Sequence, residues 1–226
     1  MHICIEVNMN SEATCILQDI TKKYSAGETA LDSVNLTAFG GQILGIRGKN
    51  GAGKSTLLKI MAGVLKPTGG KRILAPGVIH NIGYLPQDIS LYESLTGKEN
   101  LKFWGIAQGL PSRAIQARTA WLLESLDLSD KADEMVSKYS GGMKRRLHLA
   151  SALMKTPYLL LLDEPTVGSD PHSAALILDL LVHFRNLGSS IVLITHQKDE
   201  LEQVADRIIT LQDGRILTES SCSTEK

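Results

Sequence analysis

The sequence of 226 residues has no excess charge of either sign, few aromatic residues and only three cysteines. Lysine plus arginine and aspartate plus glutamate each total 24, so the overall charge does not favour a nucleic-acid partner. Cys4, Cys15 and Cys222 are an odd number without paired spacing, and we expect inert thiols rather than disulfides or a zinc site. The longest apolar runs, 158–162 and 174–178, are five residues long, whereas a membrane-spanning helix needs roughly 20. We therefore expect a globular, intracellular chain without a secretory signal or a membrane span of its own.

Apolar segments typical of strands and helices alternate near both ends of the chain. Short apolar runs predict buried parallel strands at residues 42–47, 158–162 and 191–194. Helical spacing of apolar residues predicts helices at 54–64 and 174–187, whereas 94–156 contains helical spacing and no strand-like run. This pattern predicts a single α/β domain over residues 1–226. Its core comprises 1–90 and 157–226, a helical lobe is inserted at about 91–156, and the polar tail from Thr218 is expected to be frayed.

A glycine-rich loop follows the first predicted strand. Residues 48–55 have glycine, four free positions, glycine, lysine and a hydroxyl residue, which is the phosphate-loop pattern. Glycines let successive backbone N–H groups point at phosphate oxygens, and the following helix directs its positive dipole end the same way. Lys54 is expected to reach the β and γ phosphates, and the Ser55 hydroxyl to bind Mg²⁺. The loop therefore predicts a site for a nucleoside triphosphate.

Two acidic residues follow the second predicted strand. Asp163 ends the apolar run, where a carboxylate can hold the Mg²⁺ shell, and Glu164 comes directly after it. The side chain of Glu164 leaves in another direction and is suited to polarise an attacking water. Without the phosphate loop, such a pair would more often be a turn; with it, the pair indicates hydrolysis.

A third motif, Tyr139-Ser140-Gly141-Gly142-Met143, lies about twenty residues before this acidic pair. With it, the chain resembles the nucleotide-binding subunit of ATP-binding cassette transporters from about Ile16 to Ile216. The resemblance implies an ATPase with a P-loop NTPase core, a mainly parallel sheet, a small antiparallel β subdomain and an inserted helical lobe. Four positions depart from the family pattern, at Met143, Tyr139, Ser169 and Lys49, and residues 71–81 are shorter than the family's usual antiparallel hairpin.

The resemblance also implies roles for individual residues, with ATP and Mg²⁺ as cofactors. Glu164 would be the general base, and His196 the switch histidine near the γ-phosphate. Gln87 matches the Q-loop glutamine, which senses Mg²⁺ beside the membrane partner, and Mg²⁺ would be held by Ser55, Gln87 and Asp163. Nucleotide contacts would come from Tyr24, which would stack on adenine, and from Gly48, Lys49, Asn50, Gly51, Ala52, Gly53, Lys54, Ser55 and Thr56. The nucleotide of the opposite subunit would meet the signature Ser140, Gly141 and Gly142 and the D-loop Asp170.

Two helices, beginning after Gly53 and Ser140, have N-termini that can bind anions. Their presence suggests that one chain alone does not form a complete nucleotide site. The resemblance therefore implies a homodimer, or a heterodimer with a similar ATPase, that sandwiches two ATP molecules. It also implies a transmembrane permease partner at the cytoplasmic face of the cell membrane. Segments 141–147 and 95–101 are similar to those of the exporter branch, and the basic run 144–146 is read as a solvated helix face rather than a lipid contact. The alternatives are a soluble cassette ATPase acting on nucleic acid or ribosomes, and a phosphate-loop kinase, which would leave the signature unexplained.

Overall fold

The computed structural model describes residues 12–25 and 27–222, so Cys4 lies outside the described residues. The chain forms two compact units, which are considered separately. The core unit comprises the described residues up to Tyr84, residues 157–164 and the residues from Val182 onward. The helical unit comprises residues 85–156 and 165–181.

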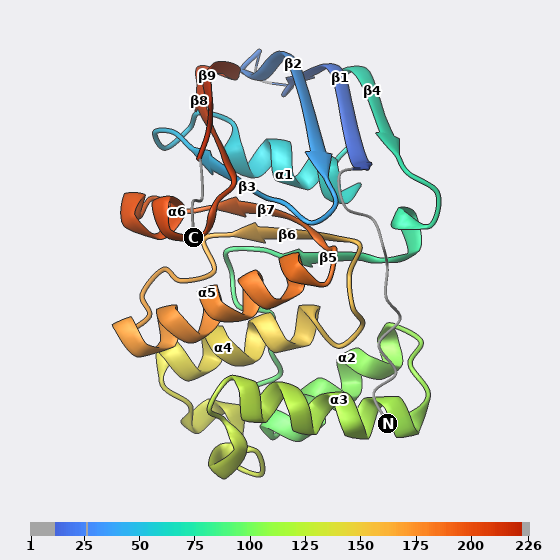
Figure 1. Cartoon of the computed structure of the whole chain (residues 1–226), viewed down its shortest axis with the longest axis vertical. Helices are drawn as coiled ribbons and strands as arrows, with labels where there is room; N and C mark the ends of the chain where they lie inside the picture. Colours follow the sequence, from blue (N-terminus) through green and yellow to red (C-terminus); the bar gives the residue numbers. More distant parts are fainter. Residues whose placement is uncertain (1–11, 26, 223–226) are drawn as a thin grey trace. The chain divides into compact units, whose positions relative to one another are not determined.

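The core unit contains a six-stranded sheet in the order β5-β6-β7-β3-β8-β9 (Figure 1). Its strands are β3 (Ile43–Arg47), β5 (Ile82–Leu85), β6 (Leu159–Asp163), β7 (Ser190–Ile194), β8 (Arg207–Gln212) and β9 (Arg215–Ser221). Strand β3 pairs in parallel with β7 and β8, and β6 pairs in parallel with β7, whereas β9 is antiparallel to β8. The prediction of an α/β fold with a mainly parallel sheet is confirmed.

A second, antiparallel sheet has the order β2-β1-β4. It is built from β1 (Ala13–Lys23), β2 (Thr29–Phe39) and β4 (Gly69–Leu74). Both neighbours of β1 run antiparallel to it, so the small β subdomain is present. The short segment between β4 and β5 holds one 3₁₀ turn, η1 (Val78–His80), and adds no further strand to this sheet.

Helix α1 (Lys54–Ala62) lies between the two sheets of the core unit (Figure 1). Alternate side chains of the parallel strands, such as Leu44, Ile46 and Val192, join Leu57 and Leu58 of α1 in one buried cluster. The opposite face of β3 approaches α6 (Lys198–Val204), where a Cβ on Gly45 would lie 2.8 Å from Leu201 Cδ2. The parallel strands are therefore covered on both faces, which explains their continuous apolar sequences.

The helical unit contains α2 (Gly97–Ala107), α3 (Ser112–Ser125), α4 (Gly141–Ala152) and the start of α5 (Pro171–Asn186). Two 3₁₀ turns, η2 (Ser129–Lys131) and η3 (Val136–Lys138), connect α3 to α4. Helix α2 begins with a capping box, in which Thr96 and Glu99 each accept a hydrogen bond from the other's backbone N–H. Over the part of the chain that the structure describes, no helix combines the length and apolar character needed to cross a membrane.

The expectation of a frayed tail from Thr218 is wrong for the residues that the structure describes. Thr218 and Glu219 pair with Thr210 and Ile209 in the β8–β9 ladder, and Arg207 forms an ion pair with Glu219. The strand escaped prediction because most of its side chains are polar and nearly all are exposed at the edge of the sheet. Backbone pairing to β8 holds it in place, together with Ile216, which packs against the core cluster.

The thiol of Cys15 is fully buried, and burial raises its pKa to about 12, as expected of an inert cysteine.

Candidate functional site

The parallel register aligns the carboxyl ends of three core strands. Ile46 of β3 pairs with Ile194 of β7, and Ile194 pairs in turn with Asp163 of β6. Each of these strands leads directly into a segment of the predicted nucleotide site: the phosphate loop, the Asp-Glu pair and His196. The carboxyl edge of an open parallel sheet is where ligands of such folds bind.

The phosphate loop has a backbone that requires glycine at two positions. Gly53 has φ +98°, and a Cβ there would lie 2.2 Å from the carbonyl oxygen of Ala30. A Cβ on Gly48 would lie 2.2 Å from the carbonyl oxygen of Leu211. Gly53 is also the N-cap of α1 and brings no side chain to bind the N–H groups of the first helical turn. Those groups are left for an anion such as a phosphate.

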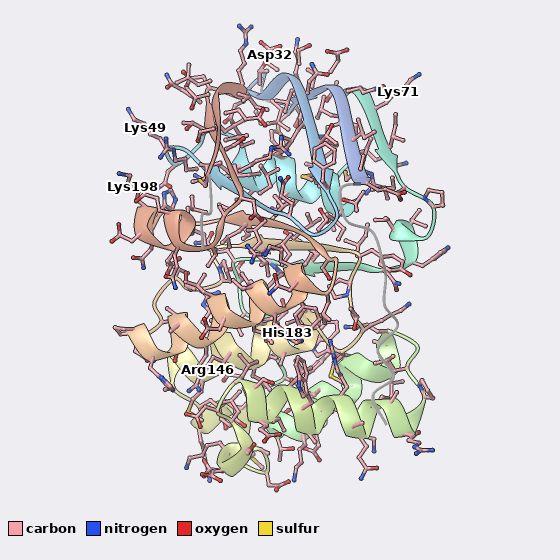
Figure 2. The ribbon with its side chains drawn as sticks, viewed as in Figure 1. Asp32, Lys49, Lys71, Arg146, His183 and Lys198 are labelled. Carbon is pink, nitrogen blue, oxygen red and sulfur yellow. The ribbon has the colours of Figure 1, made fainter. Side chains whose placement is uncertain are left out.

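Lys54, the first residue of α1, is 7% exposed and curls back over the loop. Its ammonium group donates hydrogen bonds to the carbonyl oxygens of Gly48 at 2.8 Å and Lys49 at 3.0 Å. Burial lowers the pKa of Lys54, and the carboxylates of Glu164 and Asp163 oppose that shift. The loop thus holds a cation within it, which suits a polyphosphate. The side chain of Lys49, by contrast, is exposed on the outside of the loop (Figure 2).

The side chains of Glu164 and His196 meet at the carboxyl ends of β6 and β7. The Nε2 atom of His196 lies 3.0 Å from Oε1 of Glu164, and the backbone N–H of Glu164 donates to the carbonyl oxygen of Ile194 at 2.9 Å. Glu164 has φ +56°, a left-handed conformation that is uncommon for a residue with a side chain. This turn sends the Glu164 side chain away from the direction of β6 and fixes it against β7.

The electrostatic environment of Glu164 favours a basic carboxylate. Glu164 is 6% exposed, and burial raises the pKa of its carboxyl group. His196 and Lys54 oppose this shift, and Asp163 adds to it. A carboxylate with a raised pKa is a better proton acceptor near neutral pH. This part of the site can therefore orient and deprotonate a water molecule.

Tyr24 and Thr56 lie within the core unit, at the side of α1 that faces the antiparallel sheet. The Tyr24 hydroxyl is 3.3 Å from Oγ1 of Thr56, and the Lys22 ammonium lies 5.4 Å from the centre of the Tyr24 ring. Tyr24 is 41% exposed, which leaves part of the residue open for stacking. The core unit thus brings together Tyr24, the phosphate loop, Asp163, Glu164 and His196.

The other predicted site residues belong to the helical unit. Ser140 is the N-cap of α4, and its Oγ accepts a hydrogen bond from Met143 N–H at 3.2 Å. Gln87 is exposed after β5, and its backbone carbonyl accepts a hydrogen bond from Arg145 at 2.5 Å. The Asp170 carboxylate accepts hydrogen bonds from the Ser173 hydroxyl and backbone N–H, which lower its pKa to about 2.

The expectation that 144–146 is a solvated helix face is wrong. Lys144 forms an ion pair with Glu93, and Arg145 binds the Gln87 carbonyl, while Arg146 is 7% exposed. The sequence showed three adjacent cations but not their partners. The partner of Arg145, for example, lies 58 residues away along the chain. Sequence reasoning also missed Asp127, which lies near Arg146, and His172, which contacts Asp127. Neither residue belongs to a sequence motif.

His148 of α4 gives the helical unit a dependence on pH. The residue is 2% exposed, and its Nε2 accepts a hydrogen bond from Ser90 N–H at 3.3 Å. Burial, with a smaller contribution from Arg145, lowers its pKa to about 4. An unfolded histidine titrates near 6.5, so between these values the unfolded chain binds a proton that the folded chain does not. We expect acidification from pH 7.5 to 5 to lower the free energy of unfolding by about 2 kcal/mol through this residue.

Urea unfolding at the two pH values measures this effect. His148→Gln has no charge to gain, so it should lose less stability than the wild type on acidification, although it starts from a lower value. His80→Gln, which changes an exposed histidine, is the matched control and should behave as the wild type does. An equal acid-induced loss in His148→Gln and the wild type would contradict the assignment.

Comparison with known proteins places this arrangement in a family. A family model described as "ABC transporter" matches residues 31–167. The chain is 37% identical over 94% of its length to the daunorubicin/doxorubicin resistance ATP-binding protein DrrA of Streptomyces peucetius, covering 67% of that protein. It is 39% identical over 90% of its length to the Nod factor export ATP-binding protein I of Rhizobium meliloti, covering 63% of that protein. A solved ATP-binding cassette, dimeric and bound to ADP and Pi in a post-hydrolysis state, superposes with a TM-score of 0.83 at 28% identity, covering 92% of this chain and 98% of that one. The chain therefore belongs to the ABC transporter family and is one of its ATP-binding, ATP-hydrolysing subunits.

Proposed function

We propose that the chain hydrolyses ATP in a two-copy assembly and thereby powers export through a transmembrane permease at the cytoplasmic face of the cell membrane. The observation that carries the proposal is the Glu164–His196 pair at 3.0 Å, in the same unit as a phosphate loop that encloses the Lys54 ammonium. A general base fixed by a second side chain, next to a polyphosphate cradle, is an arrangement suited to hydrolysis of the terminal phosphate.

Each site residue of the core unit has a separate role in the proposed reaction. Lys54 and the N–H groups of the first turn of α1 bind the phosphates, and Tyr24 stacks on the base. Glu164 accepts the proton of the attacking water. His196 keeps the Glu164 carboxylate in one orientation and lies near the developing charge on the γ-phosphate.

The donor set fits a magnesium ion. In the core unit, Ser55 and Asp163 would supply hydroxyl and carboxylate oxygens, which are hard ligands of the kind that Mg²⁺ prefers, and Gln87 of the helical unit is proposed to add its amide oxygen. When bound, the ion would neutralise charge on the β and γ phosphates. The role of Asp163, which is 4% exposed, would be to hold the ion's coordination shell at the end of β6.

The second half of each site would come from the partner copy. Helix α4 begins at the signature with Ser140 as its N-cap, so its positive end can meet a phosphate bound by another chain. Asp170 would lie beside it at the same interface. A solved relative is itself described as dimeric, which supports an assembly of two copies, either identical or similar.

The direction of transport is argued from the relatives. Drug resistance and Nod factor export proteins are similar to this chain over most of its length, and the segments 95–101 and 141–147 are of the exporter type. These relatives are transport proteins, which does not support the alternative of a cassette that acts on nucleic acid or ribosomes.

Membrane fractionation tests the permease partner. The chain is co-expressed with the product of a neighbouring reading frame that encodes about six hydrophobic segments of spanning length, roughly 20 residues each. We expect the chain in salt-washed membranes only when that protein is present. Recovery with ribosomes or nucleic acid, and not with membranes, would contradict the proposal and favour the soluble alternative.

A further inference from the structure

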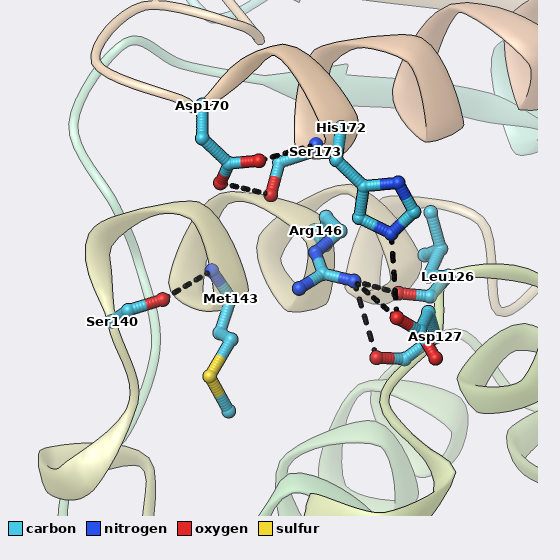
Figure 3. A network of polar contacts seen from close by, with 8 residues as sticks. All are labelled: Leu126, Asp127, Ser140, Met143, Arg146, Asp170, His172 and Ser173. Atoms are coloured by element: carbon cyan, nitrogen blue, oxygen red, sulfur yellow. Dashed lines mark hydrogen bonds and ion pairs between the residues drawn. The ribbon is translucent and has the colours of Figure 1, made fainter.

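Arg146 is a buried cation in the middle of the signature helix, and the ATPase motifs give it no role. Its Nη1 atom donates hydrogen bonds to the carbonyl oxygens of Leu126 at 2.6 Å and Asp127 at 3.1 Å (Figure 3). These carbonyls follow the last residue of α3, where a helix leaves such groups without partners. The Nε atom of Arg146 is buried and has no hydrogen-bond partner among the residues that the structure describes. Arg146 thus ties α4 to the end of α3.

Asp127 extends this connection to α5. Its carboxylate oxygen Oδ2 lies 3.8 Å from Nη1 of Arg146 and 3.3 Å from Nε2 of His172 (Figure 3). Asp127 has φ +52°, a left-handed conformation that aspartate and asparagine tolerate better than most residues. Because His172 is the second residue of α5, the carboxylate links the middle of α4, the signature helix, to the start of α5, which follows the D-loop. We call Arg146, Asp127 and His172 the α4–α5 link.

The signature and the D-loop meet closely next to this link. A Cβ on Gly142 would lie 2.7 Å from both Asp170 Oδ2 and Ser173 Oγ. The absence of a side chain at Gly142 is therefore what allows the hydrogen-bonded Asp170–Ser173 pair to approach the first turn of α4. The hydrogen bonds from Ser173 lower the pKa of Asp170, and the positive charge of Arg146 contributes in the same direction.

We infer that the α4–α5 link positions Ser140 and Asp170 as one preformed face for the nucleotide held by the partner copy. Arg146, Asp127 and His172 are positioning residues in this scheme, because they act through the signature and the D-loop. The inference rests on the proposed two-copy site. A purely structural role for Arg146 would instead affect folding, and with it nucleotide binding by the core unit of the same chain. The two roles therefore predict different effects on the two halves of a site.

Single variants give the first test. We expect Arg146→Met to lower kcat at least about tenfold, since a misplacement of about 1 Å in a catalytic site can cost a hundredfold. ATP binding to the isolated subunit, measured by nucleotide titration, should stay within about twofold of the wild-type Kd because that half-site is intact. Arg146→Lys should recover only part of the rate, because one ammonium cannot copy the planar fork of a guanidinium. Arg113→Met, at an exposed arginine of α3, is the matched control and should leave kcat unchanged.

Asp127→Asn provides a variant that should fold even if Arg146→Met does not. The Asp127 side chain is 73% exposed, and asparagine keeps the preference for a left-handed backbone while it removes the charge that faces Arg146 and His172. We expect a smaller fall in kcat, of about twofold to tenfold, with unchanged nucleotide binding.

Mixed dimers give the decisive test. Lys54→Ala subunits are mixed with Arg146→Met subunits under conditions of subunit exchange. One site of the mixed dimer then carries both defects, and the other combines an intact phosphate loop with an intact signature face. The reference is a mixture of Lys54→Ala with Ser140→Arg, which breaks the signature directly. We expect both mixtures to recover the same ATPase activity, up to about a quarter of wild type if exchange is random and each site is independent.

The outcomes separate the inference from the proposed function. If ATPase activity returns in the reference mixture but not in the mixture with Arg146→Met, the Arg146→Met substitution must damage the phosphate site of its own chain. The inference would then be wrong. No recovery in the reference mixture, with mixed dimers demonstrated, would contradict the shared site itself. Weakened nucleotide binding by isolated, folded Asp127→Asn would likewise overturn the inference.

Discussion

Glu164→Gln is expected to bind ATP with nearly wild-type affinity and to hydrolyse it at least roughly a hundredfold more slowly, which is the lower range for the loss of a general base. Glutamine has almost the same size and can still hydrogen-bond to His196, so the orientation seen at 3.0 Å can persist. An amide, however, cannot accept the proton from the attacking water. Single-turnover hydrolysis and nucleotide titration of the same preparation separate the two effects.

The matched control for this variant is Glu202→Gln, an exposed glutamate of α6 in the same unit. It should hydrolyse ATP at the wild-type rate. Near-normal hydrolysis by Glu164→Gln would move the general base elsewhere, most directly to His196, and His196→Ala would then have to abolish turnover.

Lys54→Ala is expected to weaken ATP binding itself by about tenfold to a hundredfold, the equivalent of a lost charge-assisted hydrogen bond of roughly 1.5–3 kcal/mol. The lysine has two tasks, because its ammonium group binds the carbonyl oxygens of Gly48 and Lys49 and supplies the positive charge inside the loop. Removing it leaves the phosphates without that charge and takes away a positive charge that interacts with the buried carboxylates of Asp163 and Glu164. Titration with ATP and with AMP should show the larger loss for ATP, which carries the β and γ phosphates.

Lys59→Ala is the control, since Lys59 lies on the same helix with an exposed side chain. It should bind ATP like the wild type. An unchanged ATP titration for Lys54→Ala would contradict the assignment of the loop.

Local sequence patterns were enough for the elements that surround the phosphate loop. Strand β3, helix α1 and strand β6 were predicted within a few residues because each carries its own signal: an apolar run, a glycine-rich turn or helical spacing. The helices of residues 94–156 were expected for the same reason. Glu164 and His196 were assigned from motif position. Their 3.0 Å contact adds geometry to that assignment, and their catalytic roles stay predictions.

Features that depend on distant partners could not be predicted in this way. Strand β9 is mostly polar and exposed and pairs through its backbone with β8, so no alternating burial pattern marks it. The basic run at 144–146 has the composition of a solvated surface, and only the packing of α4 against the end of α3 turns Arg146 into a buried residue. His172 and Asp127 are 45 residues apart, and neither belongs to a motif. Tertiary packing, which periodicity does not encode, brings such pairs together.

The start of α1 has a consequence for heat resistance. Helices α2 and α4 begin with Thr96 and Ser140, whose hydroxyl groups cap the first turn, whereas α1 begins after Gly53 and has no such cap. Glycine in place of a hydroxyl cap typically costs a helix about a few tenths of a kcal/mol. Phosphate oxygens that fill this position satisfy the same N–H groups, so part of the affinity for nucleotide is a helix-capping energy that the empty protein lacks. In the proposed site, nucleotide occupancy and the melting of the core unit are thereby coupled, and we expect a falling supply of ATP to shorten the survival of the folded subunit.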